Sequence, residues 1–290
     1  MSEPPRGRAE EFGRFLEIQN LGLNLPFALA FLLTASMGVP SWWTVLWIVV
    51  AFVGARNAGH AFNRIVDRDY DRQNPRTQQR ALVTGRYSLP FAVGMVALNS
   101  AALLVAAFFL NPLALVLAPI ALAAVFGYSF TKRYTALTTV FLGFVEGIPP
   151  AAIYIAVRGS LPLAALAAVG ALIAWGTAFE TVHSLGDVDA DRAAGLSSIP
   201  VRIGTRPASQ LVPALHAVAL LLLALFGALA HLSFPFFVGL GGMALIAAAI
   251  DLRVIRNPTN ITRPFRLHMA LGAIFLAGVA VAMFVPLPIQ

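Results

Sequence analysis

Two short acidic clusters hold almost half of the acidic residues in the chain. One runs Asn63-Arg-Ile-Val-Asp67-Arg-Asp-Tyr-Asp71, and the other runs Asp187-Val-Asp-Ala-Asp191. Together they contain six of only 13 acidic side chains, and each cluster follows a long apolar segment. Carboxylates crowded at the end of a membrane helix repel one another and lose hydration, so they persist where a divalent metal neutralises them. The clusters therefore predict a magnesium–diphosphate site.

The spacing within each cluster places its polar side chains on one helical face. Residues four apart on a helix form a stripe that drifts slowly around the axis, and residues seven apart return to nearly the same face. The stripes predicted in this way are Arg56, Asn63, Asp67 and Asp71 in the first cluster, and Glu180, Asp187 and Asp191 in the second. Each stripe is expected to point into one shared site.

Basic side chains with the same spacing accompany the acidic stripes. Arg76 and Arg80 are four residues apart, as are Tyr128 and Lys132. Arginine and lysine bind phosphate oxygens, whereas carboxylates bind magnesium. A diphosphate joined to both acidic helices through a metal is the simplest ligand that uses both kinds of group.

The composition indicates a membrane protein. The chain is 59% hydrophobic and 11% charged, whereas soluble domains carry roughly 25% charged residues. Apolar runs long enough to cross a bilayer recur along it. Nine spans are predicted, at residues 20–38, 42–62, 87–110, 112–131, 136–157, 161–183, 208–230, 233–252 and 266–287. Cysteine is absent, which excludes disulfides and thiolate chemistry.

The basic residues predict the topology. All but two of the 20 lysines and arginines fall in the N-terminal segment or in the loops after even-numbered spans, the exceptions being Arg56 and Arg158. The positive-inside rule makes that side cytoplasmic, so the N-terminus is expected inside and the C-terminus outside. A multi-pass protein of the cell (inner) membrane is predicted, with its active site open to the cytoplasm. In so apolar a chain the basic excess favours topology and anionic lipid over nucleic acid.

The positions of the acidic clusters also predict the architecture. They follow the second and sixth spans, which suggests two similar four-helix halves. The expected fold is an all-α polytopic membrane protein with nine transmembrane helices around a central cavity. We expect a cytoplasmic segment at residues 1–19 and one transmembrane domain at 20–290, with its first acidic motif at 63–71 and its second at 180–191.

These motifs resemble those of the UbiA superfamily of membrane prenyltransferases, whose first motif reads Asn-x-x-x-Asp-x-x-x-Asp. The similarity continues through Asn74-Pro-Arg-Thr77, Tyr128-Ser-Phe-Thr-Lys-Arg-Tyr134 and the segment from Asp187 to Pro200. It covers most of residues 15–205, in the expected order. Residues 55–86 are similar to 4-hydroxybenzoate polyprenyltransferases, including the menaquinone-pathway branch.

The resemblance implies magnesium-dependent transfer of a prenyl group from a polyprenyl diphosphate to an aromatic acceptor such as 4-hydroxybenzoate, in ubiquinone or menaquinone biosynthesis. The implied partners are these two substrates and the lipid bilayer. By position, the metal ligands would be Asp67, Asp71, Asp187 and Asp191, with Asn63 orienting the first carboxylates. The diphosphate would bind Arg76, Arg80, Lys132 and Tyr128, and the acceptor would bind Arg56, Glu180 and His183.

The acceptor half of the site departs from the pattern. In aromatic-acid enzymes the second motif often begins with Asp, has Tyr three residues on and has Gln before the next Asp; here these positions are Glu180, His183 and Gly186. A prenyltransferase with a non-aromatic acceptor, such as a lipid, a haem precursor or a carotenoid, therefore stays open. A transporter is a third reading, although transporters place charges near the midplane at broken helices.

Two intramembrane residues keep alternative roles at this point. Glu146 is interpreted either as an acceptor contact or as the ion-pair partner of Arg56 or Lys132. Tyr154 is interpreted as a packing or interface residue. Prenyl chain length and oligomeric state are not indicated by these patterns.

Overall fold

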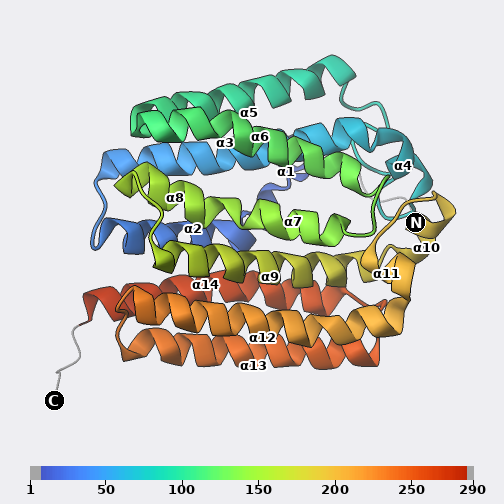
Figure 1. Ribbon diagram of the computed structural model, residues 1–290. Coiled ribbons are helices and arrows are strands. Elements are labelled where there is room, and N and C mark those ends of the chain that lie inside the picture. The colour runs from blue at the N-terminus through green and yellow to red at the C-terminus, as the bar shows by residue number, and fades with distance from the viewer. Residues whose placement is uncertain (1–7, 286–290) are drawn as a thin grey trace.

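The computed structural model describes residues 8–285, and helices are the only regular secondary structure among them. Long helices run side by side, and the shorter ones gather mainly at one end (Figure 1). In chain order they are α1 (Arg8–Phe15), a 3-10 helix η1 (Ile18–Asn20), α2 (Leu21–Ser36), α3 (Trp42–Val66), α4 (Arg68–Gln73), α5 (Leu89–Leu110), α6 (Pro112–Thr131), α7 (Thr138–Glu146), α8 (Ile148–Arg158), α9 (Leu163–Leu185), α10 (Val188–Ala193), α11 (Ile199–Ile203), α12 (Thr205–Leu229), α13 (Phe234–Arg256) and α14 (Thr262–Phe284).

Eight of the predicted spans are helical segments long and apolar enough to cross a membrane. The predicted span at 20–38 is the 16-residue helix α2, which is apolar but shorter than a typical crossing helix. The prediction of an all-α, multi-pass membrane protein is confirmed. The count of nine crossing helices and the two similar halves stay predictions.

The spanning helices close into a ring. Contacts run from α2 to α3, from α3 to α6, from α6 to α7 and from α7 to α9; they continue through α12, α13 and α14 back to α2. A buried aromatic cluster of Phe31, Phe226, Phe236 and Phe275 joins α2 to the last three helices. A cavity of about 30 Å³ lies within the bundle, lined by residues of α2, α3, α7, α8 and α9.

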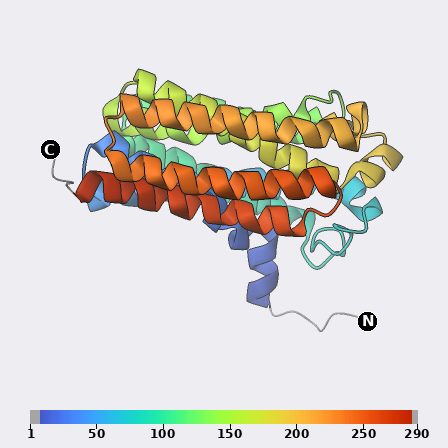
Figure 2. The same ribbon diagram turned by 90° about the horizontal axis from the view of Figure 1, so that it is seen from below.

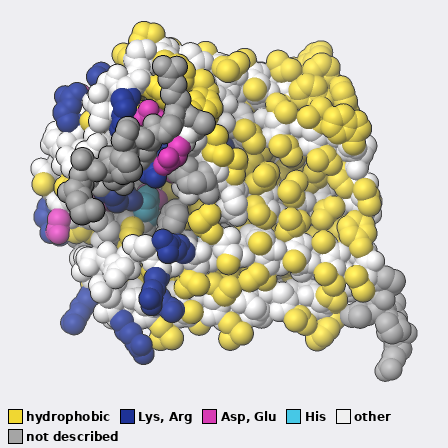
Figure 3. Space-filling view, turned by 180° about the vertical axis from the view of Figure 1, so that it is seen from behind, with side chains coloured by type: hydrophobic (Ala, Val, Ile, Leu, Met, Phe, Trp, Pro, Cys, Tyr) yellow, Lys and Arg dark blue, Asp and Glu magenta, His cyan; other side chains and the backbone are white. Residues whose placement is uncertain are grey.

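Charged side chains concentrate at one end of the bundle, and hydrophobic side chains cover the rest of the face seen in Figure 3. We call the charged end, which carries α4, α10 and α11, the polar end. At the other end, Trp42 and Trp43 are exposed beside Trp47 and Phe109. Aromatic residues of this kind favour a membrane–water interface.

Arg158 lies at the end opposite to most other basic residues, and its position has a structural reason. Its guanidinium donates to the carbonyl oxygens of Ala35 (2.7 Å) and Thr34 (3.2 Å) in the last turn of α2, where carbonyls lack a full set of helical partners. The arginine therefore caps a helix, which accounts for one of the two exceptions in the charge pattern.

Glycines permit the closest helix approaches. A Cβ added at Gly54 on α3 would lie 2.8 Å from the backbone oxygen of Asn99 and 3.0 Å from the backbone nitrogen of Leu103, both on α5. Backbone atoms cannot move aside as the end of a flexible side chain can. Small residues at such crossings let membrane helices pack closely.

We therefore expect Gly54→Ala to lower the free energy of unfolding by about 1–3 kcal/mol, the usual cost of overpacking. The measurement is a detergent-denaturation curve of the purified protein. Gly127→Ala is the matched control, because its added Cβ meets nothing within 4 Å. Equal stability of the two variants would show that the α3–α5 crossing adapts freely.

Candidate functional site

Each acidic motif straddles a joint between a spanning helix and a short one. Asp67 lies between α3 and α4, and Asp187 lies near the corresponding joint between α9 and α10. Hydrogen bonds continue across both joints: the Asp71 nitrogen donates to the Asp67 oxygen, and the Asp191 nitrogen donates to the Asp187 oxygen, each at 2.8 Å. The predicted four-residue spacing is thus kept although neither motif lies on one unbroken helix.

Asp67 is buried among donors from three directions. Its Oδ2 accepts a hydrogen bond from Asn63 Nδ2 (3.0 Å) and pairs with Lys132 Nζ (2.8 Å). Arg133 Nη2 lies 3.5 Å from Oδ1 and also donates to the carbonyl of Val66 at 2.7 Å. Two cations from the loop after α6 therefore neutralise this carboxylate.

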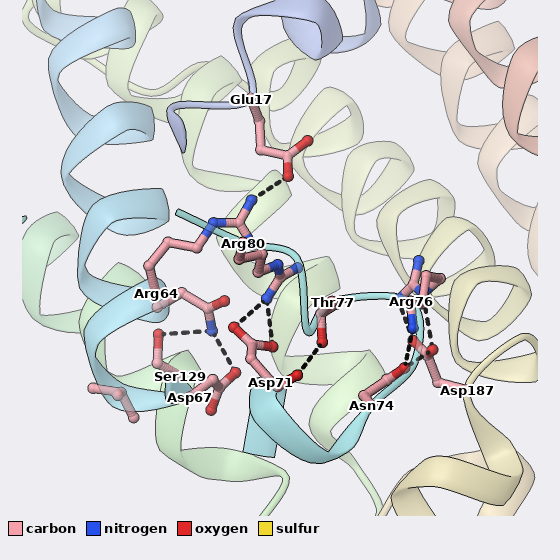
Figure 4. A network of polar contacts seen from close by, with 12 residues as sticks. Glu17, Arg64, Asp67, Asp71, Asn74, Arg76, Thr77, Arg80, Ser129 and Asp187 are labelled. Atoms are coloured by element: carbon pink, nitrogen blue, oxygen red, sulfur yellow. Dashed lines mark hydrogen bonds and ion pairs between the residues drawn. The ribbon is translucent and has the colours of Figure 1, made fainter. Parts of the chain in front are cut away.

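Asp71 is paired with Arg80 on the loop that follows α4. Arg80 Nη1 lies 2.6 Å from both carboxylate oxygens, and the Asp71 side chain is only 8% exposed. Thr77 fixes this loop, because its hydroxyl donates to the Asp71 carbonyl at 3.1 Å. Figure 4 shows this pair beside Asp67.

Asp187 joins the second motif to the loop after the first. Arg76 forms an ion pair with its carboxylate, with Nε 2.9 Å from Oδ1, and Asn74 Nδ2 donates to the same oxygen at 3.3 Å (Figure 4). Arg76 Nη1 also lies 2.6 Å from His183 Nε2. The structure thus brings together side chains that are more than 100 residues apart in sequence.

Tyr128 and Glu180 lie next to this cluster. The Tyr128 hydroxyl donates to Glu180 Oε1 at 3.2 Å, and Glu180 Oε2 is 3.5 Å from His183 Nδ1. Through His183, this group is continuous with Arg76. Two residues predicted for the diphosphate, Arg76 and Tyr128, are therefore connected to two predicted for the acceptor, Glu180 and His183.

Asp191 has a strongly perturbed carboxyl group. Burial raises its pKa to about 6, and the nearby negative charge of Asp187 adds to the rise, while Lys132 opposes it. Asp69 and Asp189 behave differently, since their side chains are 84% and 101% exposed and lie 3.7 Å from Arg72 and Arg192. In each cluster the middle aspartate faces solvent, so the stripe pattern correctly separates the inward carboxylates from the outward one.

Arg56 lies beneath the N-terminal segment. Its Nη1 and Nη2 donate to the backbone oxygens of Leu16 and Glu17, each at 2.9 Å. Glu17 has a left-handed backbone conformation (φ 55°) and pairs with Arg64, which lies within the first acidic motif. α1, which precedes this segment, projects away from the bundle (Figure 2).

A surface pocket of about 510 Å³ opens at the polar end, and its lining includes Asn74, Arg76, Asp187 and Asp189. Among the described residues, no three acidic or histidine side chains lie close enough together to enclose a metal ion. Aspartate oxygens nevertheless suit a hard divalent cation, and the inward carboxylates described above face cations rather than apolar groups. The donor chemistry therefore fits magnesium once those cations move to another anion.

Three contributors were missed in the sequence. Arg133 and Asn74 contact the motif carboxylates, and both adjoin predicted site residues within the matched motifs. Asn24 is the third: its Nδ2 donates to both oxygens of Glu146. The only signal for Asn24 was an amide in an apolar span, and no pattern indicates a partner 122 residues away.

A ring of spanning helices with a carboxylate and cation cluster at one end defines a multi-pass membrane enzyme of the prenyl-transferring class. The chain belongs to the UbiA prenyltransferase family, whose model matches residues 24–277. Because the members of this family are enzymes, the transporter hypothesis is excluded. The resemblance to the UbiA superfamily that the motifs indicate is confirmed.

Relatives extend over most of the chain. It is 34% identical to a 4-hydroxybenzoate octaprenyltransferase of Xylella fastidiosa, covering 86% of this chain and 83% of the relative. A 4-hydroxybenzoate octaprenyltransferase of Thiobacillus denitrificans is 32% identical over 84% of both chains. An apo UbiA homologue from Aeropyrum pernix has a TM-score of 0.84 and 32% identity, covering 92% of this chain and 99% of its own.

The fold is shared with more distant proteins. A UbiA homologue from Archaeoglobus fulgidus, solved with GPP and Mg²⁺ bound, has a TM-score of 0.69 at 20% identity, covering 95% of this chain and 100% of its own. At that identity the similarity concerns the arrangement of helices.

Proposed function

We propose that this enzyme transfers a prenyl group from a polyprenyl diphosphate to an aromatic acceptor such as 4-hydroxybenzoate, with magnesium, in quinone biosynthesis. The observation that carries the proposal is the pairing of Asp67, Asp71 and Asp187 with Lys132, Arg80 and Arg76 at one end of the bundle. The names of the relatives supply the acceptor, and the homologue with GPP and Mg²⁺ supports the donor and the metal.

Each group in the cluster has an assigned task. Magnesium would be held by Asp67, Asp71, Asp187 and Asp191, and when bound it would neutralise the charge that grows on the leaving diphosphate. Asn63 orients Asp67 through the hydrogen bond described above. Arg76, Arg80, Lys132 and Tyr128 would bind the phosphate oxygens.

The ion pairs imply an exchange of partners on substrate binding. Without ligand, each cation neutralises a carboxylate. Diphosphate offers the cations a stronger anion, and the released carboxylates then gain a metal ion. Because every charge has an opposite partner both before and after, no bare charge is left in this partly buried site.

The transfer itself needs little acid–base chemistry. The allylic C–O bond breaks, and the electron pair leaves with the diphosphate. The aromatic ring forms the new C–C bond to the allylic carbon and then loses its ring proton, so the products are the prenylated acceptor, pyrophosphate and one proton. Exclusion of water by the surrounding helices protects the allylic cation.

For the acceptor, we assign Arg56, Glu180 and His183 to the inner wall of the site. Glu180 and His183 contact the diphosphate-binding residues Tyr128 and Arg76, so an acceptor beside them would lie next to the breaking bond. Arg56 is the cation available for a carboxylate on the acceptor. Its hydrogen bonds to backbone carbonyls imply that acceptor binding displaces part of the N-terminal segment.

We also propose that the polar end faces the cytoplasm and that the enzyme lies in the inner membrane. The concentration of basic side chains at that end supports this orientation through the positive-inside rule (Figure 3). Water-soluble diphosphate and magnesium would then enter from the cytoplasm.

The test is a membrane assay with magnesium, geranyl diphosphate and 4-hydroxybenzoate. Prenylated acid and an equal amount of pyrophosphate are the expected products. Pyrophosphate release with a glycerol-phosphate lipid or another non-aromatic acceptor, and none with 4-hydroxybenzoate, would overturn the aromatic assignment while keeping the donor site.

The pKa of Asp191 predicts a pH dependence for magnesium. Below a pH of about 6 this carboxyl group is protonated, and the metal must displace its proton. We expect the apparent magnesium affinity, measured from pyrophosphate release, to fall up to about tenfold per pH unit below 6 and to level off above it. In Asp191→Asn the affinity would be weaker at high pH and this pH step would vanish; persistence of the step would assign it to another group.

A further inference from the structure

Glu146 is a carboxylate deep in the ring whose partners differ from those of the motif aspartates. Asn24 Nδ2 donates to its Oε1 and Oε2 at 3.0 and 2.8 Å, and is its sole hydrogen-bond donor among the described residues. The two cations considered as partners are engaged elsewhere: Arg56 with backbone carbonyls and Lys132 with Asp67. Within the part of the chain that the structure describes, Glu146 therefore forms no ion pair, although the charge of Arg56 is near enough to attract it.

The backbone around Glu146 holds it in place without neutralising it. The residue ends α7, and α8 begins at Ile148 and continues with Pro149 and Pro150, which have no N–H to donate. Across from it, a Cβ at Gly176 of α9 would lie 2.9 Å from the Glu146 Cβ. The close approach of α9 confines the side chain toward Asn24, and the prolines remove two amides that could satisfy the carboxylate.

Glu146 and Asn24 form the polar corner of an otherwise apolar cavity of about 30 Å³. The aromatic part of its lining consists of Phe27, Phe31, Phe52, Trp175 and Phe179. A carboxylate has about four lone-pair sites, and one amide group cannot fill them. The corner therefore has spare acceptor capacity, in a setting where an unmet hydrogen bond is costly.

This combination discriminates between the two substrates. A prenyl tail would remove water from the Glu146 carboxylate without supplying a hydrogen-bond donor. The acid group of a benzoate would be repelled by Glu146, because both are negatively charged. A flat ring that carries a hydroxyl group supplies both the apolar faces and the missing donor. Arg56 lies four residues after the wall residue Phe52 on α3, so it is one helical turn, about 5.4 Å, nearer the polar end and is placed for the opposite end of such a ring.

We propose that Glu146, held by Asn24, determines acceptor specificity by accepting a hydrogen bond from the acceptor's hydroxyl group. The inference rests on the proposed aromatic acceptor and adds its orientation: hydroxyl toward Glu146, acid group toward Arg56. The cavity must widen to admit a ring, since its present volume matches about one water molecule.

The test compares wild type with Glu146→Gln, which keeps the size of the side chain and removes its charge. We expect the KM for 4-hydroxybenzoate to rise about tenfold, because hydrogen bonds to charged groups are about twice as strong as neutral ones. The KM for geranyl diphosphate should stay unchanged. Tyr154→Phe is the control: it removes a buried hydrogen bond between α8 and α2, Tyr154 to Thr34 at 3.1 Å, outside the cavity lining, and should alter neither KM.

An unchanged acceptor KM in Glu146→Gln would overturn the proposal, and a rise in the geranyl diphosphate KM instead would assign the cavity to the prenyl tail. A binding measurement tests the role of Glu146 independently of whether the enzyme prenylates 4-hydroxybenzoate. Thermal stabilisation by 4-hydroxybenzoate should exceed that by 4-methoxybenzoate in wild type, and the difference should be smaller in Glu146→Gln, whose neutral amide oxygen is a weaker acceptor. If wild type shows that preference without prenylating 4-hydroxybenzoate, the proposed acceptor fails and the role of Glu146 stands; if it shows no preference, the role of Glu146 fails.

Discussion

Asp67→Asn is expected to reduce magnesium-dependent pyrophosphate release at least about 100-fold, the scale on which loss of one transition-state charge contact acts. Asp67 is buried, and it meets Asn63, Lys132 and Arg133 at once. Asparagine keeps its size but cannot supply the negative charge that a divalent cation needs. The loss should appear in kcat and should not be restored by raising magnesium at neutral pH.

The matched control is Asp69→Asn, two residues along the same segment. Its carboxylate is 84% exposed and lies 3.7 Å from Arg72, and exposed pairs of this kind contribute little. Activity within about twofold of wild type is expected from it. If both variants lost activity equally, the local structure of α4 rather than the charge of Asp67 would be responsible.

Arg80→Ala is expected to have the second largest effect, because it removes a diphosphate contact and leaves Asp71 without its cation. Breaking a buried pair by removing one partner typically costs about 3–5 kcal/mol in stability. Here Arg80 is 26% exposed, so solvent should reduce that cost. We expect both a lower denaturation midpoint and a KM for the prenyl diphosphate raised at least about tenfold.

Arg80→Lys separates the two effects. Lysine keeps the charge beside Asp71 and should restore most of the stability, but it lacks the planar group that contacts several phosphate oxygens. A raised KM in a stable Arg80→Lys protein would support the diphosphate role, and a normal KM would show that Arg80 serves Asp71 alone. Arg72→Ala, at a 58% exposed position, is the control for general loss of charge.

Helix positions could be predicted from the sequence because membrane spans depend on long apolar runs. α6 matches the predicted span at 112–131, and most others differ by only a few residues. The break of the span at 136–157 into α7 and α8 was not predicted. Its cause is local, since Gly147 is followed by two prolines within the first turn of α8. A prediction from hydrophobicity depends on the length of an apolar run, so it does not detect a break within that run.

Much of the candidate site was also predictable, for a different reason. Four-residue spacing survives the joints at Asp67 and Asp187, so the inward carboxylates could be told from Asp69 and Asp189. Contacts between segments that are far apart in the sequence could not be predicted from it. The contact of Asn24 with Glu146 and of Arg56 with backbone carbonyls depends on how helices pack, which one-dimensional spacing does not encode.

The ion pair between Arg76 and Asp187 also bears on how the protein is made. The two residues are 111 positions apart, so at a synthesis rate of about 5–20 residues per second Arg76 emerges roughly 5 to 20 s before its partner. During that interval Thr77 and Arg80 can already bind Asp71, but Arg76 lacks its carboxylate partner. The arrival of α10 at the polar end then fastens that loop to the newly inserted second motif. A chain that ended before the second motif would therefore leave the basic side chain of Arg76 without this partner.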